Sequence, residues 1–346
     1  MKERENNYDV LRVISAFGVV IAHVSASFVE TFLWDFYDGL PGNHPLYSVL
    51  YTTIGRFTVP AFFMLSGAFL LSDSRTGDVH SFFKRSFQRV GIPAIAAMGF
   101  GVIYSLISAT VFDHTGILPV IQGLLNGTPF YHLWYLPVLL GIYLLCPWVY
   151  RFKQEVSERA FCYTAIGMTA AGCLALWMNE PVTMHWNIGE AFCYLGFFLM
   201  GSVLRQNCRK GNAGIVYILL GLVMEAGCGI LLYRALLNGM DRTLAEHRYI
   251  VSYAPLIAIA SVMIFAGFSK LTIKTDVRRL SSAAYGVYLT HAFILDVVLR
   301  ISRACFGQRA LTHLDARIAI PVLAIIIFIL SVLLTEVIRN LRKTST

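Results

Sequence analysis

Residues 10–29 read VLRVISAFGVVIAHVSASFV, and this stretch indicates the fold. Its length matches the roughly 20 apolar residues that a helix needs to cross the hydrocarbon of a bilayer. Two of its residues do not suit a secretory signal peptide, because Arg12 and His23 interrupt the apolar run. We therefore expect the stretch to remain in the protein as a membrane-spanning helix.

Similar apolar stretches recur along the whole chain. The 346 residues are 57% hydrophobic and only 14% charged, whereas soluble domains have about 25% charged residues. A lipid bilayer solvates apolar side chains, so this composition favours a membrane protein over a soluble one. The expected fold class is all-α, a polytopic membrane helix bundle of about ten transmembrane helices that forms one integral-membrane domain over residues 1–346. The candidate spans are 10–29, 45–71, 90–112, 132–150, 160–178, 186–204, 214–236, 249–269, 282–300 and 318–338.

The basic residues indicate the orientation of the chain. The formal net charge is +8, but Lys and Arg lie in short clusters between apolar runs, which argues against a nucleic-acid partner. The alternate loops 30–44, 113–131 and 179–185 contain no Lys or Arg. Because cytoplasmic loops carry the excess of Lys and Arg, we expect both the N and the C terminus in the cytoplasm.

The cysteines do not form a recognisable framework. Seven cysteines are scattered singly, and none belongs to a C-x-x-C pair. Most of them lie inside apolar runs, which is typical of buried free thiols. We expect neither a structural disulfide nor a cysteine-ligated metal site.

Two polar residues share one face of the first span. His23 lies eleven positions after Arg12. At 100° and 1.5 Å per residue, the two side chains point within about 20° of the same direction and lie about 16 Å apart along the helix axis. Charged groups in a membrane normally face protein or water, so this face is expected to line a polar path. The alternative is that Arg12 snorkels to the surface and His23 makes an interior hydrogen bond.

Further polar residues occur deep in other spans. Arg56 lies in the second span near the depth of His23, and Pro60 predicts a kink in that helix. Two cationic side chains at one depth predict a shared cavity for an anionic or electron-rich guest. The alternative is that Arg56 pairs with an acidic residue such as Glu190. His291 is expected near mid-membrane in the ninth span, which strengthens the prediction of a polar cavity.

A basic pair precedes the third span, and an aromatic run opens the fourth. Arg85 and Arg89 are four residues apart, so they share one helix face, where paired cations suit phosphate capture. The alternative is ordinary anchoring of the cytoplasmic loop by basic residues. The aromatic run 130–135 is typical of the membrane interface, and it places His132 near the outer mouth of the bundle.

Four stretches together resemble the membrane acyltransferase-3 family of bacterial multi-pass O-acyltransferases. They are Asp9-Val-Leu-Arg12 with His23, Arg56 through Val59-Pro60-Ala-Phe62-Phe63-Met-Leu-Ser66-Gly67, His132-Leu-Trp134-Tyr135-Leu, and Tyr285-Gly-Val-Tyr288-Leu-Thr-His291. Their order and spacing make the resemblance specific, and it extends over essentially the whole chain. The run 130–135 looks most like the branch that O-acetylates surface glycans such as enterobacterial common antigen. A further branch is similar to the membrane domain of vancomycin-resistance serine racemases, which is thought to move serine.

The resemblance implies transfer of an acetyl group from cytosolic acetyl-CoA to a hydroxyl of a cell-surface or lipid-linked glycan, in the bacterial cytoplasmic (inner) membrane. No cofactor is expected to stay bound, and glycan-assembly proteins are possible partners. The resemblance maps catalytic roles onto His23, Arg12 and Arg56, and all candidate site residues together fall into four groups. These are the catalytic His23, Arg12 and Arg56, the coenzyme-binding Arg85, Arg89 and Lys84, the substrate-side His132, Trp134, Tyr135, His291 and Glu190, and the supporting Asp9.

One departure from the family pattern leaves the coenzyme contacts open. The family often has two arginines three residues apart before the third span, whereas Arg85 and Arg89 are four apart. His23 is expected to act as a general base or to carry the acetyl group briefly, and His291 is the alternative base. Two other functions fit polar residues at mid-membrane, namely transport of a small polar solute such as serine, and a scaffold or flippase partner in glycan assembly.

Overall fold

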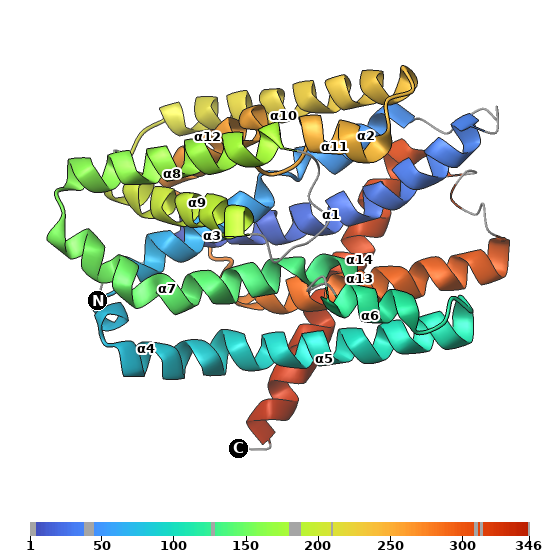
Figure 1. Ribbon diagram of the computed structural model, residues 1–346, viewed down its shortest axis with the longest axis horizontal. Helices are drawn as coiled ribbons and strands as arrows, with labels where there is room; N and C mark the ends of the chain where they lie inside the picture. The colour runs from blue at the N-terminus through green and yellow to red at the C-terminus, as the bar shows by residue number, and fades with distance from the viewer. Residues whose placement is uncertain are drawn as a thin grey trace. The chain divides into compact units, whose positions relative to one another are not determined.

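The computed structural model describes residues 5–37, 45–125, 129–179, 188–208, 210–307, 311 and 314–344 (Figure 1). This described part is mostly helical and contains no strand, which confirms the predicted all-α class. The α-helices are α1 (Asn6–Tyr37), α2 (Pro45–Ile54), α3 (Thr58–Leu70), α4 (Val79–Ser86), α5 (Ile92–Ile107), α6 (Leu118–Leu125), α7 (Tyr135–Glu155), α8 (Glu158–Met178), α9 (Ile188–Gln206), α10 (Ala213–Leu237), α11 (Arg242–Tyr249), α12 (Pro255–Lys270), α13 (Arg278–Phe306) and α14 (Ala316–Thr344).

Most of these helices have the dimensions of membrane spans. Within the described ranges, eight helical segments are long and apolar enough to cross a membrane. The other two predicted spans, 186–204 and 249–269, fall on α9 and α12, which have 19 and 16 residues. The protein is therefore a multi-pass membrane helix bundle, while the count of ten spans and the cytoplasmic termini stay predictions.

The chain divides into two compact units. The first unit comprises Met1–Phe62 and Cys208–Thr346, and the second comprises Phe63–Asn207. This division does not say whether either unit folds alone, so the single domain over residues 1–346 also stays a prediction.

Helix α1 provides much of the core of the first unit. It packs against α2, α13 and α14. Val20 and Val24 of α1 belong to one buried apolar cluster with Val287 of α13 and Ile320 of α14. Helix α10 packs against α12 and α2 in the same unit. These helices therefore bring the polar residues of α1, α2, α10 and α13 into one bundle.

The second span is interrupted within the first unit. Helix α2 ends at Ile54 and α3 begins at Thr58, so Arg56 lies between two helices. The sequence predicts a kink at Pro60, and the interruption lies one turn before it. A proline ring clashes with the carbonyl four residues earlier, which belongs to Arg56. The side chain of Thr58 donates a hydrogen bond of 2.7 Å to the Gly55 carbonyl, which satisfies one of the freed backbone groups.

The second unit contains α4 to α9 and most of α3. Its first membrane segment is one helical run over Val79–Phe112, with π-helical turns at Phe87–Gly91 and Ser108–Phe112. Asp78 caps this run, because its carboxylate accepts a hydrogen bond from the Ser81 N–H. Helix α9 packs against α8 and α7.

Candidate active site

Two histidines lie together in the first unit. The ring centroids of His23 on α1 and His291 on α13 are 5.2 Å apart, with an interplanar angle of 37°. His291 is fully buried, whereas His23 is partly exposed. One imidazole is therefore held in the core while its neighbour stays accessible.

Backbone carbonyls fix the orientation of His291. Its Nδ1 lies 3.1 Å from the Val287 carbonyl oxygen and 2.9 Å from that of Tyr288. Carbonyl oxygens only accept hydrogen bonds, so Nδ1 carries the proton and donates it to them. In the neutral ring the lone pair is then on Nε2, which makes Nε2 the basic atom of His291.

Arg56 completes what we call the histidine site, which consists of His23, His291 and Arg56. The positive charge of Arg56 acts electrostatically on His23 and also on Glu225 of α10. Glu225 is completely buried. The predicted grouping of two histidines and a cation is thus present within one unit, together with a carboxyl group that the sequence analysis did not name.

Two glycines allow the helix interruption to approach α1. A Cβ atom added to Gly55 would lie 2.5 Å from the Gly18 carbonyl oxygen, and one added to Gly18 would lie 2.5 Å from the Thr58 methyl carbon. Real Cβ atoms do not tolerate such distances, so only glycine fits at these positions. The backbones of α1 and the interruption are in contact, which brings Arg56 next to the helix that carries His23.

A second polar group, the Arg12 network, lies farther along α1 and consists of Arg12, Asp9 and Ser281. The Nη1 atom of Arg12 donates hydrogen bonds of 3.0 Å to Asp9 and 2.9 Å to Ser281. Ser281 in turn donates a hydrogen bond of 2.6 Å to the same Asp9 oxygen. Asp9 and Ser281 are buried. The expected support of Arg12 by Asp9 is therefore present, and Ser281 adds a third member.

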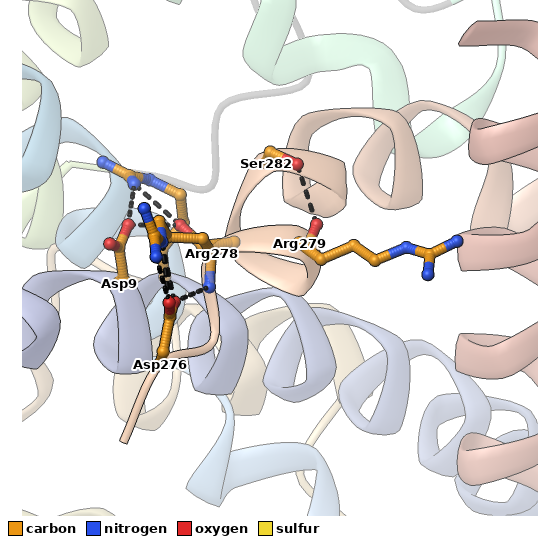
Figure 2. Close-up of polar contacts among 7 residues, drawn as sticks. Asp9, Asp276, Arg278, Arg279 and Ser282 are labelled. Carbon is orange, nitrogen blue, oxygen red and sulfur yellow. Dashed lines mark hydrogen bonds and ion pairs between the residues drawn. The ribbon is translucent and has the colours of Figure 1, made fainter. Parts of the chain in front are cut away.

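Further arginines surround the Arg12 network at the start of α13. Figure 2 shows Arg278 between Asp9 and Asp276, with the Arg279 side chain pointing away from both. Arg278 and Asp276 form an ion pair of 2.5 Å, and the field of Asp9 also reaches Arg278. This end of the first unit is rich in guanidinium groups held by carboxylates.

Arg12 and His23 both face α13, as their shared helix face predicts. Arg12 contacts Ser281, and His23 contacts His291. Because the contacts advance in the same direction on both helices, α1 and α13 run parallel. The Arg12 network and the histidine site are therefore connected along one helix pair.

The predicted coenzyme residues lie in the second unit. Lys84 and Arg89 are exposed, and Arg85 is half-buried. Arg85 donates a hydrogen bond of 2.9 Å to the Arg75 carbonyl. A π-helical turn, a feature that is frequent at functional sites, begins at Phe87 between Arg85 and Arg89. The four-residue spacing of Arg85 and Arg89 therefore spans a junction between an α-helical and a π-helical turn.

The loop before α4 is held by charge. Asp73 accepts hydrogen bonds from the guanidinium of Arg75 and forms an ion pair of 2.7 Å with it. These hydrogen bonds and the charge of Arg75 lower the pKa of Asp73 below its ordinary value. The carboxylate therefore stays ionised at neutral pH and keeps this loop in place beside Arg85.

The substrate-side candidates of the second unit lie among aromatic rings. The ring centroids of Trp134 and Tyr194 are 5.8 Å apart, and those of Tyr135 and Phe63 are 4.7 Å apart. His132 is buried, with its ring centroid 5.6 Å from that of Phe130. Glu190 is buried in the first turn of α9. Of the substrate-side residues, only His291 lies in the first unit.

Comparison with known proteins identifies the family. A family model described as an acyltransferase domain matches residues 5–336, which is nearly the whole chain. The chain belongs to the acyltransferase-3 family. No curated protein and no solved structure gives a significant match. Membership in the acyltransferase-3 family makes the protein a multi-pass membrane acyltransferase, and the four motif stretches lie within the matched region.

Two residues that the structure places in or near the polar groups of the first unit were not named by the sequence analysis. Glu225 is an acidic residue in the middle of α10, whose other charged residue, Arg234, lies in the last turn, and that position was a usable signal. Ser281 gave no comparable signal, because serine is common in membrane helices. Its role follows only from the packing of α13 against α1.

Proposed function

We propose that this membrane acyltransferase transfers an acetyl group from cytosolic acetyl-CoA to a hydroxyl of a cell-surface or lipid-linked glycan, in the cytoplasmic membrane of a bacterium. The observation that supports this most is the meeting of His23, His291 and Arg56 in one unit. Acyl transfer to a hydroxyl needs a base for the hydroxyl proton and a positive group for the developing oxyanion.

In this reaction His23 takes the proton from the acceptor hydroxyl as its oxygen bonds to the thioester carbonyl carbon. Arg56 stabilises the negative charge that forms on the carbonyl oxygen. The carbon–sulfur bond then breaks, and the coenzyme thiolate recovers the proton from His23. In a two-step variant His23 attacks the thioester carbonyl carbon, and the carbon–sulfur bond breaks to release the coenzyme thiolate. The acceptor hydroxyl then attacks the acetyl group and displaces His23, while Nε2 of His291 accepts the hydroxyl proton and passes it to the thiolate.

The remaining predicted residues have binding roles in this proposal. Arg12, fixed by Asp9 and Ser281, contacts the thioester arm or a coenzyme phosphate from the side of α1. Lys84, Arg85 and Arg89 hold the nucleotide end, since guanidinium groups bind phosphate well. The aromatic side chains of Trp134 and Tyr135, with His132 and Glu190, provide stacking surfaces and polar groups suited to a sugar.

The test is acetyl transfer by the purified protein in liposomes that contain acetyl-CoA and a lipid-linked glycan acceptor. We expect acetylated acceptor by mass spectrometry, and loss of the same glycan acetylation from cells that lack the protein. The interrupted second span also resembles the broken helices of transporters, which keeps transport of a small polar solute as the second candidate. Solute uptake without any acetylated product, and no heat protection of the protein by acetyl-CoA, would establish that function instead.

A further inference from the structure

Glu225 stands out among the acidic residues of the first unit. It lies in the middle of α10, with none of its side chain exposed to solvent. Both carboxyl oxygens are buried, and neither has a hydrogen-bond partner of normal geometry among the described residues. A carboxyl group placed in a membrane helix in this way is costly unless a specific neighbour compensates for it.

The packing of α10 on α2 places Glu225 at the helix interruption. Gly229, one turn later on α10, faces Leu50 and Thr53 of α2, with a Cβ position 3.1 Å from each side chain. Glu225 lies one turn before Gly229. If α10 and α2 are antiparallel, the residue of the second span opposite Glu225 lies one turn after Thr53, at Arg56. The groups that act on the Glu225 carboxyl are the Phe57 N–H and the Arg56 guanidinium, which agrees with this antiparallel register.

Two positive groups thus meet one carboxyl group. The Phe57 N–H belongs to the first turn before α3, where backbone N–H groups have no helical partner and the helix dipole is positive. Arg56, the preceding residue, adds a positive charge at the same interruption between α2 and α3. The same groups, the Arg56 guanidinium and the N-terminal N–H groups of α3, are those that an oxyanion in the histidine site would use.

We propose that Glu225 is the positioning residue of Arg56, and that it holds the guanidinium and the start of α3 in the orientation that stabilises the oxyanion of acyl transfer. This inference rests on the proposed function. Glu225 touches neither donor nor acceptor in this proposal and acts only through Arg56. Its removal therefore lowers the rate of the chemical step and leaves the binding of acetyl-CoA unchanged.

The test is a double-mutant cycle on the full-length protein in lipid nanodiscs, with Glu225→Gln, Arg56→Gln and the double variant. We expect Glu225→Gln to lower kcat about 10- to 100-fold, because misplacing a group by about 1 Å costs on that order. The KM for acetyl-CoA should stay within about twofold. In the Arg56→Gln background the same Glu225→Gln change should alter kcat by less than about twofold. Cys228→Ala is the matched control, since Cys228 is equally buried and lies three residues later on α10.

The cycle has two results that overturn the proposal. Either Glu225→Gln has wild-type kcat, or it causes the same loss with and without Arg56. If Glu225→Gln does not fold, Glu225→Asp, which keeps the carboxyl group on a shorter side chain, replaces it in both backgrounds with the same criteria.

Thermal unfolding separates this inference from the proposed function. Each single variant should lower Tm, because it removes one partner of a buried polar pair, and the double variant should regain part of the loss. Additive losses of Tm show that the two residues are not paired. If the wild-type protein transfers no acetyl group while the Tm cycle shows coupling, the proposed function fails and the pairing of Glu225 with Arg56 stands.

Discussion

The chemistry of the histidine site depends on which ring nitrogen carries a proton. Nδ1–H of His291 donates hydrogen bonds to the Val287 and Tyr288 carbonyls of its own helix, α13. These bonds fix the ring orientation and leave Nε2 as the basic atom. His23, by contrast, is partly exposed on α1. The two histidines therefore have different capacities, and the accessible one is the better candidate for direct contact with substrate.

Replacement of His23 tests this assignment. His23→Ala and His23→Gln should each lower acetyl transfer by about 10²- to 10⁴-fold, because glutamine keeps polarity but cannot act as a base near neutral pH. Acetyl-CoA binding should persist in both variants. The measurement is initial rate with reconstituted protein. The control is His247→Gln, which replaces another buried histidine, on α11. Near-normal activity of His23→Gln would make His23 structural and transfer the role of base to His291.

The basic residues before α5 differ in exposure, and that difference gives a second prediction. Arg89 is exposed, whereas Arg85 also holds the Arg75 carbonyl. Arg89→Ala should weaken acetyl-CoA binding about 5- to 150-fold, the range for a charge-assisted phosphate contact of about 1–3 kcal/mol. Arg85→Ala should weaken binding and also lower Tm, because its loop contact is lost. Isothermal titration gives the affinities, and unchanged affinity in both variants leaves these residues as topology anchors.

At the scale of elements, the contact between Gly18 and Gly55 decides where Arg56 lies. Gly55→Ala should push the interruption away from α1, because its Cβ would collide with the Gly18 carbonyl. We expect a loss of activity larger than the loss of stability, measured as kcat beside Tm. Gly227→Ala in α10 is the matched control, since its added Cβ would meet no atom within 4 Å. Equal effects of the two variants would contradict the role of this contact.

The elements also show how far sequence reasoning reaches. Hydrophobic length predicted the helices well, because a bilayer imposes one strong requirement on every span. Pro60 predicted a disturbance of the second span. The helices that pack against this interruption, α1 and α10, could not be predicted, because they meet it only in the folded bundle. Helix periodicity predicted the shared face of Arg12 and His23. The proposed pairing of Arg56 with Glu225 joins residues that are distant in sequence, so no local pattern could have indicated it.

At the scale of the whole molecule, the direction of the helices bears on topology. Helices α1 and α13 run parallel, while α10 and α2 run antiparallel, as their contacts show. In a ten-span arrangement α1 and α13 are spans one and nine, which cross the membrane in the same direction. Helices α2 and α10 belong to spans two and seven, which cross in opposite directions. These directions agree with ten spans and with termini on the same side of the membrane, while the cytoplasmic side stays a prediction.

Cysteine-accessibility labelling tests that topology. Single cysteines near positions 38 and 125 should react with an impermeant reagent from outside, and those near 80 and 155 only after permeabilisation. Position 38 lies outside the described residues, and position 125 ends α6. The parent protein must lack Cys305, which is exposed. The reverse labelling pattern contradicts both the orientation and the cytosolic side of acetyl-CoA.

The interruption between α2 and α3 also has a consequence for biosynthesis. The ribosome delivers Arg56 to the translocon long before it delivers Glu225, so the nascent second span first meets lipid with its charge uncompensated. On insertion scales such a charge costs about 2.5–3.5 kcal/mol. In the proposed pairing, compensation by Glu225 becomes available only after α10 has emerged. The order of translation, as well as the folded structure, constrains where in this chain a charge of the reaction centre can be placed.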